Sequence, residues 1–82
     1  MVLHMSVPDS LAVAIGKIAY FFGTRQGAYS IDRVLRTFDF SDIPVGSKIE
    51  KITFALNRLR TNSSAFSGFL TALVSIHQLT EQ

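Results

Sequence analysis

The chain has 82 residues, of which 48% are hydrophobic and 17% are charged, and its net charge is +2. This length allows one small domain, and the apolar content excludes a disordered tail. The lack of cysteine excludes disulfide frameworks, thiolate zinc sites and thiol nucleophiles, and it leads us to expect a cytoplasmic protein. We therefore interpret residues 1–82 as a single helical interaction domain, with residues 1–6 as a loose N-terminus.

Four segments share a pattern in which a polar capping residue precedes apolar residues three and four positions apart, which is typical of helices with one apolar face. The first predicted helix covers residues 7–22. Ser6 and Asp9 have the spacing of a capping box, and Pro8 lies in the first turn, where its missing N–H is not needed. Gly23 is placed to end this helix in a left-handed conformation.

Tyr20 and Phe21 lie outside the apolar stripe of this first helix, so they either contact a second neighbour or stay exposed. The apolar run from residue 11 to residue 23 contains Lys17 and is shorter than the roughly 20 residues that cross a bilayer, so we predict no membrane span. Residues 24–29 are predicted to be a connection that turns at Gly27.

The second predicted helix is short and covers residues 30–38, beginning at Ser30. Residues 39–46 cannot continue a regular helix because they contain Pro44 and Gly46. Phe40 and Ile43 within this loop are expected to pack into the core.

The third predicted helix has the strongest start signal in the chain, a capping box formed by Ser47 and Glu50. Asn62 is a plausible residue to end it. The fourth predicted helix covers residues 64–79, after Ser63, and is apolar on nearly all sides, which is typical of a helix that is central in a bundle or lies against another protein. Together the four segments predict an all-α fold, a compact bundle of four to six short helices.

Few residues in the chain are arranged for catalysis. His77 could act as a general base, but no carboxylate or hydroxyl is arranged locally around it, and we expect it to be partly exposed or at the edge of the core. Asp39 and Asp42 could form a carboxylate pair, although aspartates beside a Pro-Gly loop more often form turns and caps. His4 and His77 are too far apart in sequence to predict a metal site. We therefore predict no enzyme activity, no cofactor and no metal.

The middle of the chain carries seven of its eight basic residues, between residues 25 and 60, together with four acidic ones. Mixed charge beside surplus aromatic residues favours protein–protein recognition, by a partner or by self-association. Nucleic-acid binding by the basic residues of the second and third helices is the alternative. The residues predicted to bind a partner are Arg33, Arg36, Asp39, Asp42, Lys48, Lys51, Phe54 and Arg58.

The order of these segments also resembles a known kind of domain. The short run Ile31–Arg36, the turn and run Gly46–Ile52, the pair Ala55-Leu56 and the pair Phe69-Leu70 follow one another after a first apolar helix. This order resembles the small helical N-terminal and adaptor domains of bacterial abortive-infection (antiphage defence) proteins. More distantly it is similar to the death fold, including CARD-like modules. The resemblance implies docking that recruits an effector, with no cofactor and no catalysis in the domain itself.

Overall fold

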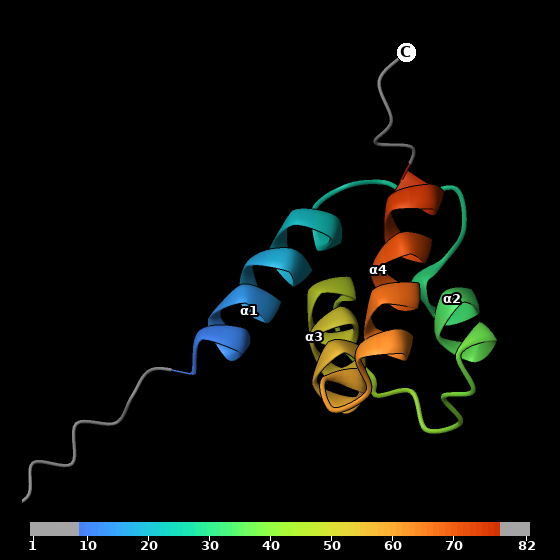
Figure 1. The fold of residues 1–82 in the computed structure, drawn as a ribbon. Helices are drawn as coiled ribbons and strands as arrows, with labels where there is room; N and C mark the ends of the chain where they lie inside the picture. The colour runs from blue at the N-terminus through green and yellow to red at the C-terminus, as the bar shows by residue number, and fades with distance from the viewer. Residues whose placement is uncertain (1–8, 78–82) are drawn as a thin grey trace, which may run out of the picture.

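The computed structural model describes residues 9–77, which form four α-helices and no strand (Figure 1). They are α1 (Ser10–Gly23), α2 (Ile31–Thr37), α3 (Lys48–Leu59) and α4 (Ser63–His77). The predicted all-α bundle is therefore confirmed over this range.

The bundle is organised around α3, against which α1, α2 and α4 all pack. In Figure 1, α1 and α2 lie on opposite sides of the bundle. One side of α4 enters the core, and Val74 on another side stays exposed. Each helix contributes three residues to one continuous core, which consists of Ile15, Ala19, Phe22, Ile31, Val34, Leu35, Ile52, Ala55, Leu56, Phe69, Leu73 and Ile76.

The first helix begins three residues later than predicted. Asp9 is its N-cap, with an extended backbone and a side chain that accepts a hydrogen bond from the Ala12 N–H at 3.1 Å. Asp9 is thus the capping residue itself and not the third residue of a capping box. The predicted start at Ser6, Val7 and Pro8 lies outside the described residues.

The prediction of a left-handed Gly23 was also wrong, since this glycine is the last residue of α1 and no glycine of the chain has a positive φ. The residue is small for a different reason. A Cβ added at Gly23 would collide with the Ile49 side chain and would lie 3.0 Å from the Ile49 Cα. Gly23 therefore allows the end of α1 to touch the start of α3.

Of three predictions about where α3 and α4 begin and end, one is confirmed and two are wrong. The capping box is present, because the Glu50 N–H donates to Ser47 Oγ at 3.1 Å and the Ser47 N–H donates to Glu50 Oε1 at 2.7 Å. Asn62 does not end α3 but caps α4, where its side-chain oxygen accepts from the Ala65 N–H at 3.1 Å. Ser63, predicted as the cap, is already the first residue of α4. Residues 78 and 79 of the predicted helix lie outside the described range.

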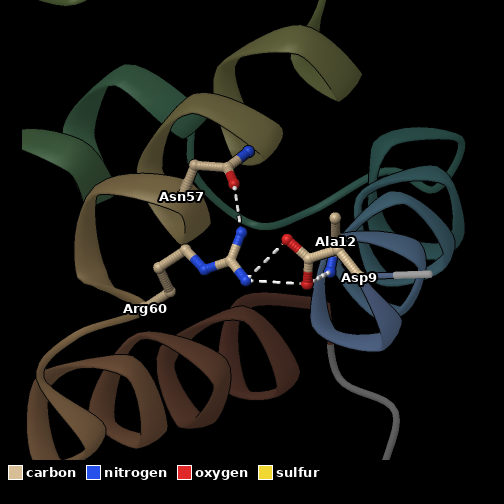
Figure 2. A network of polar contacts seen from close by, with 4 residues as sticks. All are labelled: Asp9, Ala12, Asn57 and Arg60. Carbon is tan, nitrogen blue, oxygen red and sulfur yellow. Dashed lines mark hydrogen bonds and ion pairs between the residues drawn. The ribbon is translucent and has the colours of Figure 1, made fainter. Parts of the chain in front are cut away.

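An ion pair joins the start of α1 to the end of α3 (Figure 2). The Arg60 guanidinium donates to both carboxylate oxygens of Asp9, at 2.8 and 2.9 Å, and also contacts Asn57 Oδ1 at 3.5 Å. The hydrogen bond from Arg60 is the main reason that the pKa of Asp9 is lowered, and the bond from the Ala12 N–H adds to it. One carboxylate therefore caps α1 and connects it to α3.

The loop after α2 packs as predicted, with Phe40 and Ile43 against the core. Asp39 within it has a φ of 64°. Its N–H donates to the Arg36 carbonyl at 3.0 Å, and the Phe40 N–H donates to the Leu35 carbonyl at 3.1 Å. These two bonds form a Schellman motif, in which the left-handed residue satisfies the last carbonyl groups of a helix.

Candidate functional site

Lys48, one of the eight residues predicted to bind a partner, points into the protein. Its ammonium donates to the Arg25 carbonyl at 2.7 Å and lies 2.7 Å from His77 Nε2. Burial lowers the pKa of Lys48, because the interior disfavours the charged form. These contacts hold together the start of α3, the end of α4 and the connection between α1 and α2, so Lys48 has a structural role.

His77 is more deeply buried than the core-edge position that the sequence predicted, with 7% of its surface exposed. Its Nδ1 lies 2.6 Å from the Leu73 carbonyl. Because a carbonyl oxygen only accepts hydrogen bonds, we assign the ring proton to Nδ1, and Nε2 then accepts from Lys48. Both ring nitrogens of His77 therefore have hydrogen-bond partners inside the domain.

Two more of the predicted basic residues are paired with acidic side chains. Lys51 of α3 lies 2.8 Å from Asp32 of α2, with side chains 17% and 35% exposed. Arg58 lies 3.4 Å from Asp42 of the loop after α2. These pairs neutralise charge on the predicted surface. The pairing of Asp42 with Arg58, and the capping position of Asp39, give these two aspartates separate roles.

Phe54 lies under the loop and not on an open surface. Its ring centroid is 5.7 Å from that of Phe40, and the Arg58 guanidinium carbon lies 4.7 Å from it. The Phe54 side chain is partly buried, so Phe54 connects α3 to the loop and offers little area to a partner.

Arg33 and Arg36 are the two predicted basic residues that are exposed and, among residues 9–77, have no acidic partner. The Arg33 guanidinium carbon lies 4.3 Å from the Tyr29 ring centroid, beside a hollow of about 300 Å³ between α2 and α4. Arg36 borders a different hollow, between α2, α3 and the loop. The predicted basic face is therefore divided, and this arrangement does not favour the nucleic-acid alternative.

Sequence reasoning did not assign a role to an exposed apolar surface on one side of α1, which we call the outer face of α1. Tyr20 is 64% exposed, Val13 52% and Phe21 42%. These positions lie opposite Ile15, Ala19 and Phe22, which hold α1 on the core, because helical spacing places the two groups about half a turn apart. The outer face contains a hollow of about 460 Å³ lined by Val13, Gly16, Lys17, Tyr20, Phe21, Thr24 and Arg25.

The outer face of α1 carries positive charge only. Lys17 and Arg25 line its hollow, and no described carboxylate does. Arg25 is fixed in place, since its guanidinium carbon lies 3.7 Å from the Phe21 ring centroid and one nitrogen donates to the Phe21 carbonyl at 2.8 Å. The signal for this face was present in the sequence, where Tyr20 and Phe21 lie outside the apolar stripe.

The described helices include none that is long and apolar enough to cross a membrane. Within residues 9–77, no group of three His, Asp or Glu side chains could hold a metal ion. The fold and its surfaces define a small all-α domain. Comparisons with protein-family models, with curated proteins and with solved structures found no match to this chain.

Proposed function

We propose that this chain is a non-catalytic protein–protein interaction module that docks through the outer face of α1. The exposure of Val13, Tyr20 and Phe21 on one side of a single helix is the observation that supports this proposal. Large contiguous apolar patches are uncommon on soluble monomers and are typical of surfaces that bind another molecule. Aromatic residues supply much of the binding energy at protein interfaces.

Docking on this face needs no change in the core. Ile15, Ala19 and Phe22 anchor α1 on α3, and the Asp9–Arg60 ion pair fixes its start. The outer face is therefore presented on a rigid helix. Full burial of a side chain such as Phe21 contributes about 1.5–3 kcal/mol, so two or three such residues can support a transient complex.

We further propose that the module acts in the cytoplasm, as a recruiting or self-associating domain of a bacterial antiphage defence protein. The order of its helices and the residue runs that resemble such domains support this part of the proposal. Recruitment and self-association predict different behaviour in solution. Light scattering over a concentration series separates them, because only self-association makes the mass rise with concentration.

The experiment that tests the proposal is photo-crosslinking in cells of the native host. The chain carries a photoactivatable residue at Val13 or, as the control, at Ser67, which is exposed on α4. We expect Val13 to capture a protein and Ser67 to capture none. Absence of a protein adduct at Val13, or equal adducts at both positions, would contradict docking through α1.

A further inference from the structure

We infer that the outer face of α1 receives an amphipathic helix of another protein, and that this partner helix carries carboxylate side chains. The inference rests on the proposed function, since it names the partner of the same face. Three features of the face carry it: its shape, the sign of its charge and the position of Lys17.

The shape of the face suits the side chains of an opposing helix. A Cβ added at Gly16 would meet nothing within 4 Å, so the backbone is open there. Val13 and Tyr20 lie about one turn before and after Gly16 and are both exposed. A side chain of a second helix can enter the gap between them, in the way that ridges of one helix fill grooves of another.

The backbone of α1 favours a helical partner over an extended one. An extended segment binds mainly by adding main-chain hydrogen bonds to the edge of a sheet. Residues 10–23 form a regular helix whose interior N–H and C=O groups are already bonded to one another. A partner must therefore bind through side chains, as an amphipathic helix does when it lays apolar residues into a groove.

The charge of the face selects an acidic partner. Lys17 and Arg25 line the hollow, and Asp9 at the start of α1 is already bound by Arg60. A partner with carboxylates beside its apolar residues would complement both cations, whereas a basic partner would be repelled.

Lys17 also argues against two other occupants. It adjoins Gly16 and lies among Val13, Tyr20 and Phe21, so inserting this face into a lipid interface would bury its ammonium. Two copies that paired symmetrically through this face would bring like charges together near its centre. An acidic helix avoids both penalties.

The test uses the complete chain, labelled with ¹⁵N, and two synthetic helical peptides of about 16 residues, long enough to cover α1. Both peptides have the same leucine stripe, flanked by glutamates in one and by lysines in the other. Vesicles of phosphatidylcholine, with and without phosphatidylglycerol, are the membrane probe. We expect the glutamate peptide to bind at least about tenfold more tightly than the lysine peptide and to shift the backbone amide signals of residues 13–25.

Two variants test the geometry without threatening the fold. Lys17→Glu should reverse the preference between the peptides, because it replaces attraction by repulsion. Gly16→Leu should fill the hollow and weaken binding of the glutamate peptide by about tenfold or more, while the melting temperature rises, because leucine is a better helix former than glycine. Phe54→Leu is the control, because Phe54 lies under the loop after α2 and does not line this hollow, and it should leave both affinities unchanged.

Four outcomes would each overturn the inference. The two peptides could bind with equal affinity, or neither could bind. The amide signals that shift could belong to residues outside α1, or the chain could bind the vesicles instead of a peptide. The crosslinking experiment distinguishes a failure of this inference from a failure of the proposed function. If Val13 still captures a protein in cells while the peptides are not distinguished, the interaction module stands and only the acidic helix is wrong.

Discussion

Gly16 and Gly23 are both glycines of α1, yet their surroundings predict that substitution by alanine changes the stability of the fold in opposite directions. An added Cβ meets nothing at Gly16 but collides with Ile49 at Gly23. We expect Gly16→Ala to raise the free energy of unfolding by about 0.5–1 kcal/mol, through helix propensity. Gly23→Ala should lower it by about 1–3 kcal/mol, because α1 and α3 must separate. Urea denaturation measures both, and changes of the same sign would contradict this packing.

Asp39 shows how a residue that resembles a catalytic candidate can be a structural one. Its φ of 64° lies in the left-handed region, which costs a β-branched residue about 1–2 kcal/mol and costs glycine nothing. We expect Asp39→Gly to raise the free energy of unfolding by up to about 1 kcal/mol and Asp39→Val to lower it by about 1–2 kcal/mol. Thermal melts provide the measurement, with exposed Asp42→Ala as a control that changes little. A more stable valine variant would rule out the Schellman motif.

At the scale of elements, one ion pair connects the ends of α1 and α3, and its effect depends on pH. Because the Arg60 contact lowers the pKa of Asp9 below its ordinary value of 3.8, the pair stabilises the fold fully above that value. The stabilisation is lost as the pH falls from 3.8 through the lowered pKa. Asp9→Asn removes the charge but keeps a side-chain oxygen for the Ala12 N–H.

We therefore expect the wild type to be more stable than Asp9→Asn at neutral pH and the difference to shrink below pH 3.8. Chemical denaturation across this range measures the difference. In an Arg60→Gln background the pH-dependent difference should be smaller, because the main cause of the lowered pKa is absent and the bond from the Ala12 N–H remains. A difference in stability that does not change with pH would contradict the ion pair between Asp9 and Arg60.

Lys48 connects three elements, and its removal should affect stability more than removal of an exposed lysine. Lys48→Met keeps much of the aliphatic stem but leaves the Arg25 carbonyl and His77 Nε2 without a donor. We expect the free energy of unfolding to fall by about 1–3 kcal/mol. Lys17→Met, on the exposed outer face, should change it by less than about 0.5 kcal/mol. Equal effects in urea denaturation would show that the interior contacts of Lys48 contribute nothing.

At the scale of the whole molecule, the helices could be predicted because their signals are local. The Ser47–Glu50 capping box spans four residues, and the apolar stripes repeat every three or four. Contacts between distant segments could not be read in this way. Lys51 pairs with Asp32, 19 residues away, and Arg60 pairs with Asp9, 51 residues away.

The candidate site was harder to predict for the same reason. The predicted surface required that the basic residues of neighbouring helices have no partner within the domain. Lys48 points inward, and Lys51 and Arg58 form ion pairs with aspartates. Tyr20 was noticed, but the choice between a second neighbour and solvent depends on where α2 and α4 lie. Both pack on α3, which leaves the outer face of α1 open.

The central claim is that the exposed side chains of Val13 and Tyr20 on the outer face of α1 bind a protein and contribute little to the stability of the fold. The most direct test uses the Tyr20→Ser variant. Two quantities are measured on it and on the wild type: the melting temperature and the yield of the protein adduct captured at Val13. We expect the melting temperature to stay within about 3 °C of the wild type, because Tyr20 is exposed, while the adduct disappears. An undiminished adduct, or a loss of adduct that only follows a collapse in stability, would contradict the claim.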